Sequence, residues 1–337
     1  MRSQPVRILK EGYWDRTSVV PSEDGCLRVR KESKDTASPG PWAHQALRNE
    51  IAYLASLPQA ARAYFPPLLD SWDELSIGYE IPFFAERQDV ARLSLAGKLS
   101  AEDAESIQAE LSRAVLYGLH AERENQATAF ATHLETVLEE SIIELAGMPP
   151  FRDLVESPSV SINGAAPIPG LHTALDAVRQ SGVLTLLATQ PSVRLHGDLI
   201  LENILWPGLV LIDPVSVTGL THGPPLFDLV KYESYASGEL YAIREELVTA
   251  EPAHAGGYSY EIFWSATELA AFTQLDLRSR FRAEFVHVHG PVHPQLYHLL
   301  DAYFSLVMAR NTTGRHQFAR VLKGSQCLAA SSAGLAS

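Results

Sequence analysis

The chain has 337 residues, of which 46% are hydrophobic and 20% are charged, a balance typical of a globular protein with a large core. It carries 27 Lys and Arg against 40 Asp and Glu, a formal charge of −13, which argues against a protein that grips a nucleic-acid backbone. No segment approaches the roughly 18 uninterrupted apolar residues of a membrane helix. We therefore expect neither nucleic acid nor membrane as a partner.

The N-terminal sequence and the cysteines favour the cytoplasm. The first residues, MRSQPVRILKEGYWDR, lack the apolar core of a signal peptide. The two cysteines, Cys26 and Cys327, stand far apart and match neither a disulfide framework nor a metal motif, so we expect both to be reduced. The acidic charge would mildly favour a cationic substrate by electrostatic steering.

The N-terminal region is expected to combine strands with one helix. The strand candidates, which include a hairpin turn SEDG, lie at 6–10, 18–21, 26–33, 67–72 and 76–84. Between the third and fourth strands, HQALRNEIAYLASL has helical spacing at Leu47, Ile51 and Leu54. Glu50 stands near the middle of this helix. The predicted order is strands, helix, strands.

The third strand places a lysine on an apolar face. In CLRVRKES, Leu27, Val29 and Lys31 alternate with two arginines. Because side chains alternate across a strand, Lys31 shares a face with the two apolar residues. A lysine that points inward needs a partner or a ligand.

Beyond residue 90 the sequence changes to long helical patterns. The predicted helices lie at 101–122, 130–146, 171–181, 225–247, 266–284 and 295–323. Residues 148–170 are rich in proline and suggest a loop-rich insertion, and 329–337 suggest a flexible tail. The sequence thus predicts an α+β protein with two parts, a small mixed lobe at 1–85 and a mainly helical lobe at 86–337.

The segment VRLHGDLILENILWPGLVLIDP carries the most informative polar residues. A cluster of His196, Gly197 and Asp198 is followed five positions after Asp198 by Asn203, and an apolar strand then ends in Asp213. Magnesium prefers oxygen ligands and commonly takes one or two carboxylates together with substrate phosphates. The spacing therefore suits a magnesium-bound polyphosphate.

These residues resemble the aminoglycoside phosphotransferase and choline kinase branch of the protein-kinase-like superfamily. That family has HGD, four residues and Asn in its catalytic loop, and an aspartate one strand later, often as IDP. The matching residues here are His196, Gly197, Asp198, Asn203 and Ile212-Asp213-Pro214. The resemblance implies that Asp198 accepts or orients the proton of an acceptor hydroxyl, and that Asn203 and Asp213 hold magnesium.

The resemblance extends upstream to the nucleotide. Lys31 and Glu50 stand where the family has an ion pair that fixes the lysine against the α and β phosphates. The phosphate-covering turn would be Gly12 to Ser18, with Thr17 and Ser18 as donors. The backbone of the strand that joins the lobes would read the base, at Glu80, Ile81 and Phe83.

Other positions in and after the loop are given supporting roles. Ile200 and Glu202 stand where the family often has a histidine and a glycine, so the acceptor contacts differ there. In PPLFDLVKY, Asp228 is expected to brace the catalytic loop, and His196 is expected to be a buried structural residue.

The cluster HVHGPVH offers a zinc alternative, since imidazole is a common ligand of that metal. It lacks a cysteine or carboxylate at matching spacing, and a helix-connecting loop is the preferred interpretation.

The resemblance implies a kinase that transfers phosphate from ATP or GTP to a hydroxyl of a sugar, aminoglycoside, aminocyclitol or related natural product, and that works as a monomer or homodimer. Antibiotic resistance, salvage and biosynthesis are all compatible roles. Two alternatives stay open. One is a nucleotide-binding pseudokinase that regulates a partner, and the other is a metal-dependent phosphohydrolase built from His196, Asp198 and Asp213.

Overall fold

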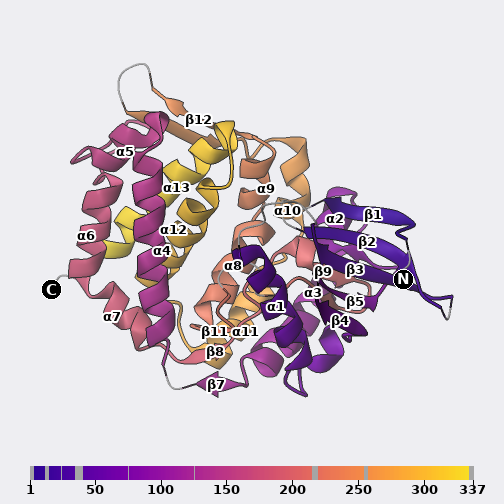
Figure 1. The fold of residues 1–337 in the computed structure, drawn as a ribbon. Helices are drawn as coiled ribbons and strands as arrows, with labels where there is room; N and C mark the ends of the chain where they lie inside the picture. The colour runs from indigo at the N-terminus through magenta and orange to yellow at the C-terminus, as the bar shows by residue number, and fades with distance from the viewer. Residues whose placement is uncertain are drawn as a thin grey trace.

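A five-stranded antiparallel sheet forms the core of the first lobe in the computed structural model, which describes residues 4–11, 15–23, 25–34, 41–74, 76–124, 126–214, 219–253 and 257–333. In spatial order the strands are β1 (Arg7–Glu11), β2 (Asp15–Pro21), β3 (Leu27–Ser33), β5 (Ile77–Pro82) and β4 (Asp70–Asp73). Helix α1 (Pro41–Ala55) packs on β3 and β5, and a short 3-10 turn, η1 (Arg62–Tyr64), follows it. Figure 1 shows this lobe at one side of the larger helical part. The predicted order of strands, helix and strands is confirmed.

The register of the sheet builds the face that meets α1. Lys31 lies directly opposite Thr17 on β2 and Tyr79 on β5, so these three side chains share one face. The neighbouring row on that face is apolar and consists of Val19, Val29 and Ile81. The period-two prediction for Lys31 is therefore confirmed.

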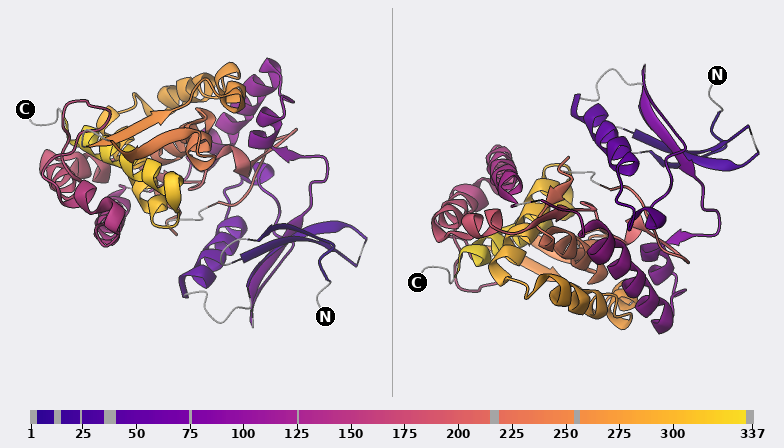
Figure 2. Two further views of the ribbon diagram at one scale, coloured as in Figure 1. Left: turned by 90° about the horizontal axis from the view of Figure 1, so that it is seen from above. Right: turned by 90° about the horizontal axis from the view of Figure 1, so that it is seen from below.

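The second lobe is mainly helical. Its helices are α2 (Val90–Leu95), α3 (Ala101–Leu111), α4 (Thr128–Ala146), α5 (Arg152–Glu156), α6 (Leu171–Ser181), α7 (Val183–Ala188), α8 (Leu226–Ala236), α9 (Glu239–Arg244), α10 (Ala270–Gln274), α11 (Ser279–His289), α12 (Pro294–Ala309) and α13 (Gly314–Ser332). Helices α12 and α13 pack on each other, and α4 and α8 both pack on α12 (Figures 1 and 2). Helix α8 is buried on nearly all sides, which makes it a rigid support for whatever it touches.

Short strands of the second lobe fix the loop that carries the HGD motif. Strand β9 (Ile204–Trp206) pairs with β10 (Val210–Leu211) and with β6 (Gln88–Asp89), just after the lobes join. Strand β8 (Ser192–Arg194) pairs with β7 (Arg123–Glu124) and β11 (His222–Gly223). The loop between β8 and β9, which includes the 3-10 turn η4 (Leu201–Asn203), is therefore anchored at both ends.

The structure differs from the sequence prediction at several boundaries. The helix predicted at 101–122 continues beyond α3 as a π-helical segment, η2 (Ser112–Leu119). The helix predicted at 225–247 is broken at Gly238, whose φ of 84° interrupts the helical backbone. Helix α13 runs through Ser332, so the predicted tail from 329 begins inside a helix, where Ser331 is buried.

Further elements appear where loops were expected. The 148–170 segment contains η3 (Pro149–Phe151) and α5, and its end is tied by a bridge between Val160 and Ile168. The predicted helix at 266–284 is instead η5 (Thr267–Leu269), α10 and the start of α11. A hairpin of β12 (Val248–Pro252) and β13 (Tyr258–Ile262) was not predicted. Across the described ranges, no helix is both long and apolar enough to span a membrane.

Candidate active site

The lysine on β3 lies at a meeting point of carboxylates from both lobes. The Nζ of Lys31 is 2.9 Å from Oε2 of Glu50 on α1 and 3.1 Å from Oδ1 of Asp213, which follows β10. The Oδ2 of Asp15 lies 3.8 Å away. The hydroxyl of Tyr79 donates to Oε1 of Glu50 at 2.7 Å. Three residues that are 19 to 182 positions apart in sequence, Lys31, Glu50 and Asp213, are thus brought together as predicted.

Lys31 and Asp213 stabilise each other's charged forms. Burial would lower the pKa of Lys31, but the carboxylates of Asp213 and Glu50 outweigh it and hold the pKa well above its usual value. Burial alone would raise the pKa of Asp213, but the Lys31 ammonium, and more weakly Lys10, bring it below the usual value. Lys31 and Asp213 are therefore a charged pair. Because one ammonium faces three carboxylates, negative charge is in excess here, which suits a divalent cation.

The HGD segment takes its shape from a buried aspartate on α8. The two carboxylate oxygens of Asp228 accept the backbone N–H groups of His196 and Gly197, each at 2.9 Å. Gly197 has a φ of 85°, a conformation that favours glycine. Asp228 thus braces the loop, as predicted.

His196 is packed inside the loop. Its ring is fully buried and lies 5.9 Å from the Phe65 ring, centroid to centroid, and its Nδ1 accepts the Asp198 N–H at 3.3 Å. Burial lowers the pKa of His196, so the ring is neutral near pH 7. These contacts describe a structural residue that shapes the loop.

Two further histidines extend this brace. His120, at the end of η2, places Nε2 at 3.2 Å from Oδ2 of Asp228 and Nδ1 at 3.0 Å from Nε2 of His289. A carboxylate only accepts, so Nε2 of His120 carries the proton, and its Nδ1 can then accept from His289. One histidine of the HVHGPVH cluster is thus engaged in the fold. Within the described ranges no group of three or more His, Cys, Asp or Glu could hold a metal ion, so the zinc alternative has no support.

Asp198 is held by one donor on each carboxylate oxygen. Nδ2 of Asn203 donates to Oδ2 at 3.0 Å and also to the Asp198 carbonyl at 2.8 Å. Lys231 on α8 places its Nζ 3.1 Å from Oδ1. The Lys231 ammonium also lies 4.6 Å from the centre of the Phe304 ring, a cation–π contact. The carboxylate is therefore fixed in one orientation, with 17% of its side chain exposed.

Asn203 and Asp213, the two residues predicted to hold magnesium, lie close together in the fold. The backbone N–H of Ile212 donates to the Asn203 carbonyl at 3.0 Å, which brings the two predicted ligands onto adjacent segments. Nδ2 of Asn203 is directed to Asp198, so the amide oxygen is the atom of this side chain that could bind a cation. Asp213 has a φ of 52°, a left-handed backbone that aspartate tolerates better than most residues. One carboxylate and one amide oxygen, together with phosphates, are a common magnesium set.

The predicted phosphate-covering turn is only partly described. Gly12 lies outside the described residues. Thr17 and Ser18 lie within strand β2 and not in a turn, so the prediction of a turn reaching to Ser18 is wrong at that end. Thr17 is on the Lys31 face, whereas Ser18 lies opposite Arg30 on the other face and is 1% exposed. The β-rich sequence DRTSVVP pairs along its whole length with β3, which explains the longer strand.

The residues predicted to read the base are Glu80, Ile81 and Phe83, and the sheet already engages several of their polar groups. The Glu80 side chain binds Arg30 on the face opposite Lys31, at 2.7 Å, and its carbonyl accepts the Leu69 N–H at 2.8 Å. The N–H of Phe83 donates to the Leu27 carbonyl at 3.2 Å. These groups are engaged because β5 lies between two strands. The side chain of Ile81, in contrast, lies on the same face of the sheet as Lys31.

Several residues of the site were not predicted. Lys231 had a signal, since it stands three residues after Asp228 and both therefore lie on one side of α8. Tyr79 could have been found from its place in strand 76–84, on the same alternation as Ile81. Asp15 had no signal in the sequence.

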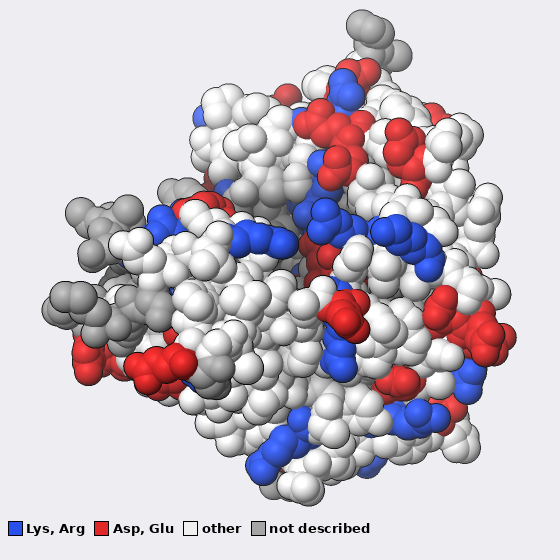
Figure 3. Space-filling model, turned by 90° about the vertical axis from the view of Figure 1, so that its right-hand side faces the viewer, with Lys and Arg blue, Asp and Glu red and all other residues white. Residues whose placement is uncertain are grey.

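A second polar group lies at the catalytic-loop positions that differ from the family pattern. Glu202, four residues after Asp198, accepts from the Tyr235 hydroxyl at 3.0 Å and pairs with Arg244 at 2.8 Å. Ile200, the other position that differs from the family pattern, is half-buried against the core. On the face in Figure 3, Lys and Arg side chains border a hollow in which acidic atoms are visible.

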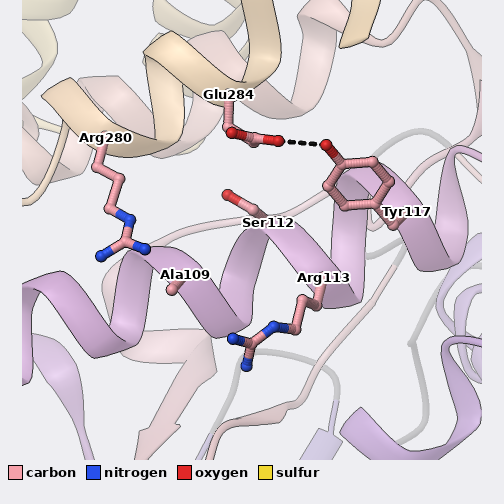
Figure 4. A pocket seen from close by; sticks show the side chains of 6 residues that line it. All are labelled: Ala109, Ser112, Arg113, Tyr117, Arg280 and Glu284. Carbon is pink, nitrogen blue, oxygen red and sulfur yellow. Dashed lines mark hydrogen bonds between the residues drawn. The ribbon is translucent and has the colours of Figure 1, made fainter. Parts of the chain in front are cut away.

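A separate hollow of about 180 Å³ lies between η2 and α11 (Figure 4). Its lining residues are Ala109, Ser112, Arg113, Tyr117, Arg280 and Glu284. The Tyr117 hydroxyl donates to Glu284 across one side of it. None of the predicted site residues lines this hollow.

Comparison with known proteins places the fold. A scan against protein-family models and a search of curated proteins returned no match. Among solved structures, a protein from Thermobifida fusca that is provisionally assigned as a fructosamine-3-kinase is 15% identical, with a TM-score of 0.52, over 97% of this chain and 94% of that one. A glucosamine kinase in complex with glucosamine, ADP and inorganic phosphate is 13% identical, with a TM-score of 0.46, over 96% and 93%.

The choline kinase LicA from Streptococcus pneumoniae is 11% identical, with a TM-score of 0.45, over 96% of this chain and 94% of that one. The names of all three proteins describe kinases. The similarity to the Thermobifida fusca protein gives the chain the two-lobed protein-kinase-like fold, as its motifs predicted.

Proposed function

We propose that this protein is a small-molecule kinase that transfers the γ-phosphoryl group of ATP to a hydroxyl of a sugar, aminoglycoside, aminocyclitol or related natural product. One observation carries the proposal. Lys31 of the first lobe binds Asp213 of the second, and a backbone hydrogen bond links the Asp213 segment to Asn203, which holds Asp198. Cation, metal ligands and acceptor-side carboxylate therefore form one continuous site.

The nucleotide would lie against the first lobe. The apolar row of Val19, Val29 and Ile81 shares the face of Lys31 and offers a surface for the base. Lys31, held by Glu50, would bind the α and β phosphates as a fixed charge. GTP is the alternative donor, since an apolar surface does not select between purines.

Magnesium would neutralise charge on the phosphates and leave the chain's own residues to position the reactants. Asp213 and Asn203 would hold it. Their suitability rests on the excess of negative charge around Lys31 and on the amide oxygen of Asn203, both described above.

Asp198 would act on the acceptor. The hydroxyl oxygen of the acceptor attacks the γ-phosphorus, the bond from that phosphorus to the bridging oxygen breaks, and ADP leaves. The hydroxyl proton passes to the Asp198 carboxylate, which Lys231 and Asn203 hold in place. Since little covalent work falls to the protein, orientation and charge supply the catalysis.

The direct test is a mass-shift screen. The protein is incubated with ATP and magnesium and with sugars, amino sugars, aminoglycosides, nucleosides and cyclitols, and products heavier by one phosphoryl group are sought. Asp198→Asn is the matched control, since it changes little in shape and removes the charge. Product that requires ATP and is lost in the control supports the proposal. Nucleotide binding without any product would favour a pseudokinase, and phosphate release from monoesters without nucleotide would favour a phosphohydrolase.

A further inference from the structure

A group of positively charged side chains lies in the second lobe, next to the loop that carries Asp198. Arg244 on α9 binds Glu202, and Glu202 is also held by Tyr235 of α8. Tyr235 is one helical turn, about 5.4 Å, after Lys231, the residue that holds Asp198. Arg244 is thus linked through Glu202 to the loop that carries Asp198, the predicted catalytic carboxylate.

Next to Arg244 lies an arginine that is buried without a carboxylate partner. Arg320 on α13 is 6% exposed, and its Nε donates to Nε2 of His316 at 2.7 Å. Within the described ranges it forms no ion pair. Lys323, three residues further on the same helix, differs sharply, because Glu239 and Asp301 bind it at 2.5 and 2.9 Å. The acidic groups of this region are therefore already engaged.

The environment of Arg320 is unfavourable for a lone charge. Burial and the nearby Arg244 lower the pKa of Arg320 to about 10, still high enough for a full charge at neutral pH. Burial and the same two arginines lower the pKa of His316 to about 4, so its ring is neutral and can accept from Arg320. The Tyr260 hydroxyl nearby is buried and has no partner among the described residues. Buried cations and donors of this kind are normally satisfied by an anion.

We propose that Arg244, Arg320 and His316 form an anion subsite for the acceptor, so that the phosphorylated molecule carries a carboxylate or a phosphate besides its reactive hydroxyl. This inference rests on the proposed kinase function and names its substrate class. Guanidinium groups suit both anions because their planar N–H groups match two oxygens at once. It replaces the cationic acceptor that net charge alone would favour.

The subsite is distinct from the nucleotide site. The nucleotide residues lie on β3 and α1 of the first lobe and at Asp213, whereas the cations lie on α9 and α13. Glu202 belongs to the catalytic loop and connects the two. An acceptor could therefore place a hydroxyl at Asp198 while its anionic group binds the arginines.

The test compares matched acceptors that differ in one group. Glucose, glucosamine, glucuronate and glucose 6-phosphate, with the corresponding inositol and ribose series, are assayed with ATP and magnesium. We expect an anionic member to have the lowest KM in its series, and the carboxylate and phosphate arms tell which anion is preferred. Arg320→Met should raise the KM for that acceptor by roughly tenfold to a hundredfold, as for a lost charged hydrogen bond, with the KM for ATP unchanged.

Controls separate this inference from the function itself. Arg310→Met removes an arginine that pairs with Glu144 elsewhere on the lobe, and it should leave both KM values unchanged. If Arg320→Met does not fold, Arg244→Gln, with its more exposed side chain, should raise the acceptor KM in the same direction. Transfer that prefers neutral or cationic acceptors, or that ignores both substitutions, overturns the anion subsite and leaves the kinase intact. Absence of transfer to every acceptor overturns the kinase proposal.

Discussion

Two lysines in this molecule bind carboxylates, but the balance of charge around them differs. Lys31 comes from β3, the central strand of the first lobe's sheet, and faces three carboxylates, those of Glu50, Asp213 and Asp15, within 3.8 Å. Lys231 comes from the buried helix α8 and faces the single carboxylate of Asp198, with an aromatic ring on another side. The first group carries an excess of negative charge, and the second is balanced.

The difference separates two tasks. An excess of negative charge favours added cations, so the Lys31 group is suited to magnesium and to phosphates brought with it. A balanced pair on a rigid helix favours one fixed geometry, so the Lys231 group is suited to orient a reactant. Substitutions in the two groups should consequently damage different steps.

The largest effect is expected at the carboxylate of the balanced pair. Asp198→Asn should lower kcat by roughly 10²- to 10⁴-fold, because the group proposed to take the hydroxyl proton is lost. Nucleotide affinity should change by less than about twofold, since Asp198 does not contact Lys31. Phosphoryl transfer to the acceptor and titration with a fluorescent nucleotide measure the two. Turnover close to wild type would remove Asp198 from its assigned role.

The next effect concerns the other lysine. Lys31→Met should destabilise the fold by about 3–5 kcal/mol, because Glu50 and Asp213 lose the cation that offsets their burial. Nucleotide binding should weaken in parallel. Urea unfolding at pH 7 and nucleotide titration check both. A variant with wild-type stability would show that the three carboxylates do not depend on this ammonium.

A smaller effect is expected at the lysine of α8. Lys231→Met should reduce kcat by roughly tenfold to a hundredfold, as for the loss of one charged hydrogen bond, with nucleotide affinity retained. Lys98→Met, an exposed lysine of the same lobe, is the matched control and should not change kcat. If Lys231→Met weakened nucleotide binding instead, the division of tasks between the lysines would be wrong.

The smallest effect is in the brace behind the loop. Burial and the neighbouring His120 lower the pKa of His289 to about 3, below its usual value of 6.5. The unfolded chain thus binds a proton that the folded chain does not, so stability is complete above pH 6.5 and is lost as the pH falls toward 3. The loss should be about 1 kcal/mol or less per pH unit, since the ring is partly exposed. His289→Gln, which cannot be protonated, should show a shallower loss of Tm between pH 7.5 and pH 5.

Sequence reasoning succeeded where a short-range pattern fixes the geometry. Alternation along one strand was enough to place Lys31, and a loop of fixed length was enough to place Asp198 beside Asn203. Both are decided by neighbours in the chain. The fold class followed from the order of strands and helices together with these motifs.

Sequence reasoning failed where the packing of segments that are distant in the chain decides which residues meet. Lys231 reaches Asp198 because α8 packs beneath the loop, and its spacing from Asp228 indicates only the side of α8 on which it lies, not this contact. The anion subsite joins α9 to α13, which are remote in sequence. The β12–β13 hairpin had a sequence signal only in part, since Tyr258, Tyr260 and Ile262 stand at alternate positions in a strand of only five residues.

The contact between Lys31 and Asp213 spans 182 positions and joins the two lobes directly. Without nucleotide, this bond is one of the contacts between the lobes, together with those that Arg194 makes to the carbonyls of Tyr53 and Ser56. A triphosphate that enters must exchange with a carboxylate already in place, so its affinity reflects the difference between two sets of contacts. Weakening the hold of Asp213 on Lys31, by Asp213→Asn for example, should therefore lower the cost of moving Lys31 onto the phosphates.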